Sequence, residues 1–291
     1  MQEIHALARA CDALGYVVED ELATVLYLML RLEKPLLLEG NPGVGKTEVA
    51  QIMAAYLETD LIRLQCYEGL DAHAALYEWN YQKQLLAIKI NEQSGLHAEE
   101  QEARIFGEAY LLKRPLLQAI TAPDRAPVLL IDEVDRADEE FEAFLLELLS
   151  AYQISIPEMG TIRATHKPVV ILTSNRTREL SDALKRRCLY HWVDYPPFER
   201  ELKIIHKHLP DIDDELATRL VRFVEQLRTM RLDKAPGIAE TIDWARSLLA
   251  LGATRFEEPY VSRSLGAVLK SDADIRAVRE HGVEALLEST R

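Results

Sequence analysis

The sequence predicts an α/β fold in which helices flank a parallel sheet, followed by a smaller domain made only of helices. Three observations lead to this prediction. Short, wholly apolar runs, which are typical of strands buried on both faces, alternate with helical segments up to about residue 194. A glycine-rich segment joins the first of these runs to a helix. Beyond residue 194 only helical patterns follow, with prolines where helices are expected to end.

The elements of the α/β part follow in chain order. Asp20 to Leu32 carries apolar residues at helical spacing, and Lys34 and Pro35 end that helix. A further helix is expected from Glu48 to Leu57. The strands expected in the sheet are Leu36–Leu38, Leu61–Cys66, Val128–Ile131, Val169–Leu172 and Leu189–Val193. The segment from Asp71 to Ala119 is too long for a simple crossover, and we expect it to be a mostly helical insertion.

The pattern changes near Tyr195, where two prolines follow. We place the domain boundary at Asp194, so that residues 1–194 form the α/β domain and residues 195–291 the helical domain. The helices expected in the second domain are Glu199–His208, Asp214–Met230, Ile238–Leu251 and Val261–Lys270.

Composition and charge restrict the function classes. The chain has 291 residues with 34 Lys and Arg against 48 Asp and Glu, so its formal net charge is −14. An acidic chain repels a phosphate backbone unless its basic residues cluster, which argues against nucleic acid as a partner. The three cysteines lack metal-binding spacing, no signal peptide is recognisable, and no apolar run is long enough to span a bilayer. We therefore expect a soluble, cytoplasmic protein without a transmembrane segment.

The glycine-rich segment carries the strongest motif. Its residues Gly40, Asn41, Pro42, Gly43, Val44, Gly45, Lys46 and Thr47 match the pattern GxxxxGK[ST] between a strand and a helix. Gly43 and Gly45 allow backbone N–H groups to turn toward phosphate oxygens. Lys46 would neutralise β- and γ-phosphate charge, and the Thr47 hydroxyl would ligate Mg²⁺. The alternative is an ordinary glycine turn.

Two carboxylates end the strand that begins at Val128. Ligands in open α/β sheets bind beyond the carboxyl ends of the strands, so Asp132 and Glu133 can both face a nucleotide. We expect Asp132 to hold Mg²⁺, directly or through water, and Glu133 to polarise an attacking water. A GTPase would carry an NKxD motif, which the sequence lacks, and a small-molecule kinase needs no water-activating Glu here. The alternative is an acidic strand end without a role.

Two further polar features follow in the sequence. Asn175 comes directly after a buried strand and could orient the water or contact the γ-phosphate, although it could equally cap a turn. Arg186 and Arg187 end a short helix before the last strand and could project into a neighbouring subunit's active site as an arginine finger. Their alternative is a solvated basic helix end, which the helix dipole favours.

In their order, these motifs resemble those of the AAA+ ATPases, and specifically the MoxR-type branch. The resemblance implies that Gly40–Thr47 is Walker A, that Asp132 and Glu133 form Walker B, and that Asn175 is sensor 1. It implies Arg187 as the finger, because the family's arginine directly precedes the next strand, and Arg186 is the next candidate.

The resemblance also implies the architecture of an AAA+ P-loop core with a small all-α lid domain. The long insertion would correspond to the helix-2 insert, and Ile154–Ala164 to the pre-sensor-1 hairpin. Both would face the pore side of a ring; the alternative for Ile154–Ala164 is an ordinary hairpin.

Within this branch, Cys66–Asp71 and Leu76–Tyr81 look most like the CoxD-type members. That resemblance implies an ATP- and Mg²⁺-dependent chaperone that assists maturation or metal-cofactor insertion of a client such as a molybdenum-containing carbon monoxide dehydrogenase. It also implies a hexameric ring and a partner protein with a von Willebrand A domain. Trp79 and Tyr81 could equally belong to the core of the insertion.

One departure concerns sensor 2, which is usually an arginine at the start of the lid helix. Here Glu240 lies near that place and Arg246 is the nearest arginine along the helix, so sensor 2 stays unassigned. Two other functions remain open: a nucleic-acid motor of restriction or replication type, and an ATP-gated assembly scaffold for another client.

Overall fold

The computed structural model describes residues 1–91, 106–157 and 159–290 and divides into two compact units. Unit 1 comprises residues 1–20, 40–49 and 192–291, and unit 2 comprises residues 21–39 and 50–191. The helical C-terminal part thus groups with the N-terminus and with the glycine-rich segment. The domain boundary at Asp194 remains a prediction.

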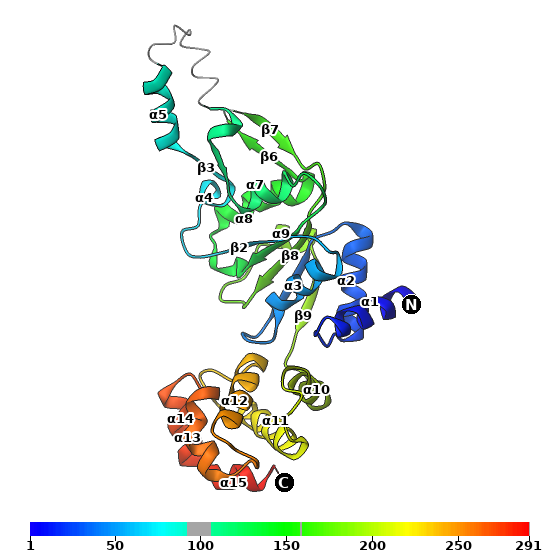
Figure 1. The fold of residues 1–291 in the computed structure, drawn as a ribbon, viewed down its shortest axis with the longest axis vertical. Coiled ribbons are helices and arrows are strands. Elements are labelled where there is room, and N and C mark those ends of the chain that lie inside the picture. Colours follow the sequence, from blue (N-terminus) through cyan, green and yellow to red (C-terminus); the bar gives the residue numbers. More distant parts are fainter. Residues whose placement is uncertain (92–105, 158, 291) are drawn as a thin grey trace. The chain divides into compact units, whose positions relative to one another are not determined.

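A five-stranded sheet in the order β2-β5-β8-β1-β9 forms the centre of the α/β part (Figure 1). Its strands are β1 (Leu36–Gly40), β2 (Leu61–Gln65), β5 (Val128–Asp132), β8 (Val169–Ser174) and β9 (Leu189–Val193). Neighbours among β2, β5, β8 and β1 pair in parallel. All five predicted strands are present, and β1, β5 and β8 extend one or two residues further than predicted.

The burial of the strands explains why the sequence reveals them. Every residue of β1 and β5 is buried, as expected for parallel strands covered on both faces. The register pairs Glu39 with Ser174 and Ile131 with Leu172. Because the strands run parallel, the polar residues that follow them emerge at one edge of the sheet.

The helices of the α/β part are α1 (Gln2–Ala13), α2 (Asp20–Leu32), α3 (Lys46–Tyr56), α7 (Pro115–Ile120), α8 (Glu139–Ala151) and α9 (Asp182–Arg187), with the short 3-10 helix η2 (Val134–Arg136). Helix α7 packs against β2 and β5, and α8 packs against α9. Helix α8 was not predicted, although Asp138 caps it by accepting a hydrogen bond from the Phe141 amide at 2.8 Å, which is a readable start signal.

The long insertion contains helices, as predicted, and a small two-stranded sheet that was not predicted. Its described elements before α7 are α4 (Ala72–Leu76), β3 (Tyr77–Trp79), α5 (Tyr81–Asn91), η1 (Glu108–Tyr110) and β4 (Leu111–Lys113). Strands β3 and β4 pair antiparallel. Three-residue strands are too short to show a period-two pattern, which is why the sequence did not reveal them. Residues 92–105 of the predicted insertion lie outside the described residues.

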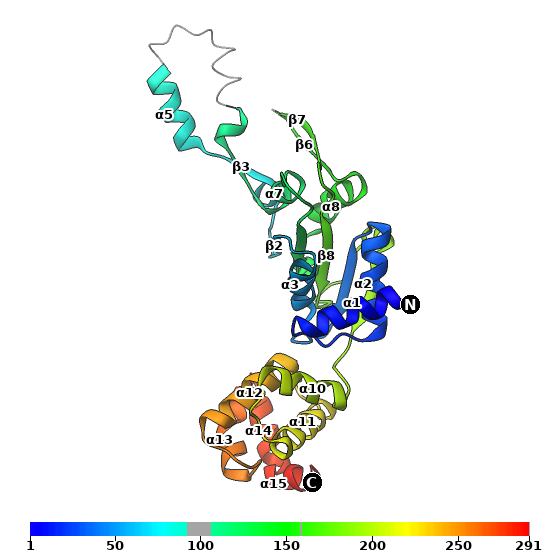
Figure 2. The same cartoon turned by 45° about the vertical axis from the view of Figure 1, so that its right-hand side comes forward.

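The hairpin expected at Ile154–Ala164 is confirmed. It consists of β6 (Gln153–Ile156) and β7 (Gly160–Arg163), which pair antiparallel with Ile154 opposite Ile162. Glu158, which belongs to the predicted segment, lies outside the described residues. Within unit 2, both views place this hairpin at the end that also carries α5 (Figure 2).

The C-terminal part is all helical, as predicted. Its helices are α10 (Phe198–His208), α11 (Asp214–Thr229), α12 (Ile238–Ala250), α13 (Glu258–Val268), α14 (Asp272–His281) and α15 (Val283–Glu288), of which the last two were not predicted. Phe223, Trp244 and Phe256 centre its core, with ring centroids 5.4 to 5.5 Å apart. Among the described residues, no helix is both long and apolar enough to cross a bilayer.

Candidate nucleotide site

The predicted site residues fall into two groups, and the first is the glycine-rich loop of unit 1. It begins at Gly40, where β1 ends, and leads into α3 at Lys46. Gly43 and Gly45 have φ angles of +75° and +88°, in the left-handed region that favours glycine. A Cβ on Gly40 would overlap the Val193 carbonyl oxygen, so this position also requires glycine.

Lys46 is folded back over the loop. Its side chain is buried, and Nζ donates hydrogen bonds to the carbonyl oxygens of Gly40 at 2.9 Å and Asn41 at 2.7 Å. The first N–H groups of α3, which no helix carbonyl can satisfy, lie at the same place in the chain. A glycine loop, a helix N-terminus and one ammonium group together fit an anionic phosphate group.

The N-terminus of α12 contacts this loop within unit 1. The amides of Ile238 and Ala239 donate to the Gly43 carbonyl oxygen at 2.9 and 3.4 Å. Glu240 Oε2 accepts from the Gly237 amide at 3.0 Å, and a Cβ on Gly43 would lie only 2.8 Å from that oxygen. The group beside the loop at the start of α12 is therefore a carboxylate.

Two arginines near this loop in the sequence of unit 1, Arg246 and Arg228, bind other partners. Arg246 pairs with Asp243 at 3.5 Å on an exposed face of α12. Arg228 of α11 forms an ion pair with buried Glu201 at 2.5 Å and donates to the Pro236 carbonyl at 2.8 Å. Sequence reasoning missed Arg228, whose partners lie on other helices. It joins α10 and α11 to the segment that begins α12.

A cavity adjoins the loop, also within unit 1. It is lined by Gly15, Tyr16, Val17, Val44, Gly45, Glu48, Pro196, Arg200, Ile204, His208, Ile238 and Ile242. Burial raises the pKa of the Glu48 carboxyl, and the charge of nearby His208 opposes that shift. Apolar side chains next to a phosphate loop can accept the flat ring of a nucleotide base.

The second group of site residues lies in unit 2, where Asp132 ends β5. Its side chain is buried, and both carboxylate oxygens are held. Thr173 Oγ1 donates to Oδ1 at 2.5 Å, and Arg63 donates to Oδ2 from Nε at 3.1 Å and Nη2 at 2.5 Å. Thr173 also accepts a hydrogen bond from the Glu133 amide at 2.9 Å. Sequence reasoning missed the roles of Arg63 and Thr173, which lie on the neighbouring strands β2 and β8.

The donor set at Asp132 fits the chemistry of Mg²⁺. This ion prefers oxygen ligands and usually keeps several of its waters, which need acceptors such as a carboxylate. In the structure a guanidinium cation contacts the carboxylate, so the position favours positive charge.

Glu133 differs from Asp132 in its surroundings. Its φ of +54° lies in the left-handed region, which non-glycine residues adopt only uncommonly. Its side chain is about one-third exposed and Oε2 pairs with Arg136 Nη1 at 3.1 Å. Glu133 and Asn175 both line an open hollow of about 640 Å³. The structure therefore brings the predicted water-activating carboxylate and the predicted sensor 1 residue to one place.

Asn175 reaches this hollow because β8 lies beside β5. The backbone amide of Asn175 donates a hydrogen bond to Asp135 Oδ1 at 3.2 Å. The amide and hydroxyl of Thr177 donate to Asp135 Oδ2 at 2.8 and 2.7 Å. Asp135 is buried, so this carboxylate fixes the backbone that carries Asn175.

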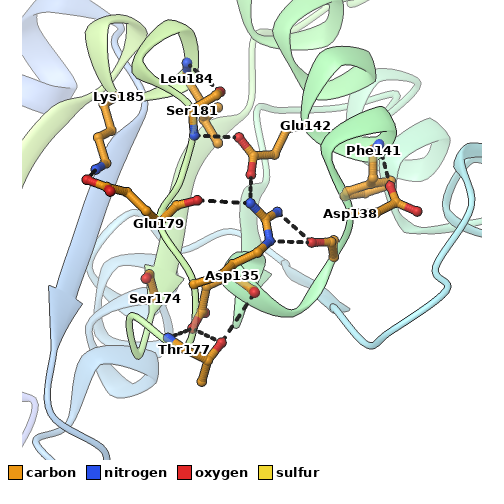
Figure 3. A network of polar contacts seen from close by, with 12 residues as sticks. Asp135, Asp138, Phe141, Glu142, Ser174, Thr177, Glu179, Ser181, Leu184 and Lys185 are labelled. Atoms are coloured by element: carbon orange, nitrogen blue, oxygen red, sulfur yellow. Dashed lines mark hydrogen bonds and ion pairs between the residues drawn. The ribbon is translucent and has the colours of Figure 1, made fainter.

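A second buried carboxylate fixes the chain that follows (Figure 3). Glu142 of α8 accepts from the Ser181 amide at 2.9 Å and forms an ion pair with Arg178 at 2.5 Å. The Arg178 guanidinium also donates to the carbonyl oxygens of Ala137 and Glu179. The loop between β8 and α9 is thereby attached to α8 and to the residue that follows η2.

We expect Arg178→Ala to destabilise the protein by about 3 kcal/mol, because it leaves the Glu142 carboxylate buried without its cation. Lys185→Ala is the control, since Lys185 pairs with the exposed Glu179 at 3.4 Å and its removal should cost less than about 1 kcal/mol. Urea unfolding followed by circular dichroism measures both changes. An equal decrease in the free energy of unfolding for the two variants would contradict the proposed contribution of the Arg178–Glu142 ion pair to stability.

Arg186 and Arg187 are not brought to the hollow. Both are exposed at the end of α9. Two residues later, the Leu189 amide donates to the Pro35 carbonyl at 2.8 Å, directly before β1 begins. A five-residue strand spans about 16 Å, so the two arginines lie at the edge of the sheet opposite the one that carries Glu133 and Asn175.

Comparison with known proteins identifies the family. The sequence model of the AAA domain, dynein-related subfamily, matches residues 35–188, more than half of the chain. The chain belongs to this AAA family. Uncharacterized proteins of Staphylococcus haemolyticus and of Staphylococcus aureus strain NCTC 8325 are 28% and 29% identical to this AAA protein. Their alignments cover 77% and 76% of this chain and 78% and 77% of their own.

Solved structures share the fold of this AAA protein. Two variants of RuvB from Thermotoga maritima match it with TM-scores of 0.53 and 0.52, at 19% and 20% sequence identity. The matches cover 94% of this chain and 83% and 82% of theirs. The predicted AAA+ fold and family are confirmed, whereas the narrower MoxR-type and CoxD-type assignment remains a prediction.

Proposed function

We propose that this AAA protein binds ATP with Mg²⁺ and hydrolyses it to remodel a client protein. The observation that carries the proposal is the meeting of Glu133 and Asn175 at one hollow of unit 2, where β8 pairs with β5 and the buried Asp132 ends β5. Together with the glycine loop of unit 1, these residues would supply phosphate binding and water activation in one chain.

The binding roles follow from the chemistry of the residues. The loop from Gly40 to Thr47 would hold the phosphates through backbone N–H groups, and Lys46 would turn from its loop carbonyls to the β- and γ-phosphate oxygens. Thr47 and Asp132 would hold Mg²⁺, which supplies charge neutralisation on the phosphate oxygens when bound.

In the hydrolytic step, Glu133 would orient a water and take up its proton as the oxygen bonds to the γ-phosphorus and ADP leaves. Its ion-pair partner Arg136 is exposed, with 3.1 Å between Arg136 Nη1 and Glu133 Oε2. The carboxylate can therefore exchange this ion pair for a hydrogen bond with water. Asn175 would orient the water or contact the γ-phosphate. Arg187 of a neighbouring subunit, or else Arg186, would stabilise the developing charge.

The finer proposal is a MoxR-type chaperone of the CoxD subgroup, acting in the cytoplasm as a hexameric ring with a von Willebrand A domain partner. Its client would be a metalloenzyme such as a molybdenum-containing carbon monoxide dehydrogenase. The resemblance of Cys66–Asp71 and Leu76–Tyr81 supports this subgroup. Trp79 supports it less than the other residues do, because it is buried against Tyr77 and Phe106 and serves the core of the insertion.

Nucleotide binding tests the proposal first. We expect Lys46→Ala to weaken ATP binding about 100-fold, because it removes a charge-assisted hydrogen bond from a buried phosphate contact. Lys167→Ala is the control, because Lys167 lies outside the glycine loop and pairs with the exposed Glu33. This variant should bind ATP as tightly as the wild type. Isothermal titration calorimetry measures both affinities. Equal ATP affinity in the two variants would refute the binding role.

The client is tested by isolating the protein with its native partners and identifying them by mass spectrometry. A co-isolated metalloenzyme that stimulates ATP hydrolysis supports the chaperone proposal. Stimulation by DNA or RNA instead would refute it and favour a nucleic-acid motor.

A further inference from the structure

Arg63 is a residue near the proposed metal position for which the proposed function has assigned no role. It lies on β2, opposite Leu130 of β5 and two residues before Gln65, which faces Asp132 in the register. Its side chain is 52% exposed, while that of Asp132 is 3% exposed. The guanidinium donates to Asp132 Oδ2 from both Nε and Nη2, and Nη2 also donates to Gln65 Oε1 at 2.6 Å.

These contacts engage the side of Asp132 that a metal would need. Oδ1 already accepts the Thr173 hydroxyl, which in turn accepts the Glu133 amide, so Oδ1 is part of a continuous buried network. Oδ2 accepts two N–H groups of one half-exposed cation. A hydrated Mg²⁺ that approached Oδ2 would meet both occupied lone pairs and a positive charge.

We propose that Arg63 is a positioning residue that holds Asp132 in the nucleotide-free protein and leaves Oδ2 when the metal–nucleotide complex binds. The inference rests on the proposed function and deepens it. Two cations compete for one carboxylate oxygen, because their mutual repulsion acts at a few ångströms in a partly buried place. Gln65 Oε1 and solvent give the displaced guanidinium other acceptors. Metal affinity is thus lowered by the need to displace Arg63.

Two other roles for Arg63 make different predictions. If Arg63 were a phosphate ligand, its removal would weaken nucleotide binding even without metal. If it only stabilised the fold, its removal would lower the melting temperature and leave metal affinity unchanged.

The test compares Arg63→Gln with Arg114→Gln. Arg114 is a matched control, because it is 49% exposed and pairs with Glu78, and its substitution changes the net charge equally. Mn²⁺ is the probe, and its free signal in electron paramagnetic resonance reports binding in the presence of ADP. We expect Arg63→Gln to bind Mn²⁺ up to about fivefold more tightly than the wild type, the range for one half-exposed ion pair. Arg114→Gln should match the wild type.

Further measurements separate the outcomes. ADP affinity without metal should be the same in the wild type and Arg63→Gln, and Mg²⁺ with ADP should raise the melting temperature more in the variant. Arg63→Lys keeps a cation but loses the contact through two N–H groups, so its Mn²⁺ affinity should lie between those of the wild type and Arg63→Gln. The same variant replaces Arg63→Gln in the test if Arg63→Gln folds poorly. Unchanged Mn²⁺ affinity, or weaker metal-free ADP binding, would overturn the inference alone. A wild type that binds no ADP would overturn the proposed function.

Discussion

Mixing Arg187→Ala chains with Lys46→Ala chains is expected to restore ATP hydrolysis that neither variant shows alone. Arg187 lies at the end of α9, where the chain joins β9 beside the beginning of β1. Glu133 and Asn175 lie at the opposite edge of the sheet, and one strand length of about 16 Å exceeds the reach of an arginine side chain. We therefore expect Arg187 to act on a neighbouring subunit's nucleotide and not on its own.

The expected loss is large. Removing an arginine finger lowers the rate of phosphoryl transfer by about 10³-fold or more. Folding should change little, because Arg187 is exposed. In the mixture, an Arg187→Ala chain offers an intact nucleotide pocket and a Lys46→Ala chain offers an intact finger, so some interfaces are complete. Phosphate release by the two variants and by their mixture measures this.

The mixture of Lys46→Ala with Glu133→Gln is the control. Both of those chains carry a defective pocket, so no interface between them is complete and no activity should return. Normal hydrolysis by Arg187→Ala alone would show that Arg187 is not the finger, and Arg186→Ala would then be the variant to measure.

Glu133→Gln is expected to lower the hydrolysis rate by about 10²- to 10⁴-fold, the range for loss of a general base, while ATP stays bound. The amide has the size of the carboxylate but cannot accept the proton of the water. Lys46, Thr47 and Asp132, to which we assign nucleotide and metal binding, are unchanged. Single-turnover hydrolysis and the ATP dissociation constant, measured on the same preparation, separate the two effects.

Glu139→Gln is the matched control for Glu133→Gln. Glu139 is an exposed glutamate in the first turn of α8, and its substitution removes the same charge a few residues away. It should hydrolyse ATP at the wild-type rate. A fall in ATP affinity that accompanied the loss of rate in Glu133→Gln would contradict the assignment of Glu133 as the water-activating residue.

The elements that could be predicted from the amino-acid sequence are those encoded by contiguous residues. The glycine loop was predicted because its backbone geometry and its flanking strand and helix are encoded within about a dozen residues. The central strands were predicted because burial on both faces requires an uninterrupted apolar run, as in β1 and β5. The family followed from the order of these local signals along the chain.

The remote residues that hold the site in place could be recognised only from the folded chain. Arg63 meets Asp132 across 69 residues, and Glu142 holds the Ser181 amide across 39 residues. Each contact depends on which strands and helices become neighbours, and a single polar residue on an edge strand or a helix gives no sign of its partner. The left-handed backbone at Glu133 likewise could not be predicted from the sequence, because glutamate has no local preference for that conformation. A hydrogen bond from its amide to Thr173 on the neighbouring strand holds it there.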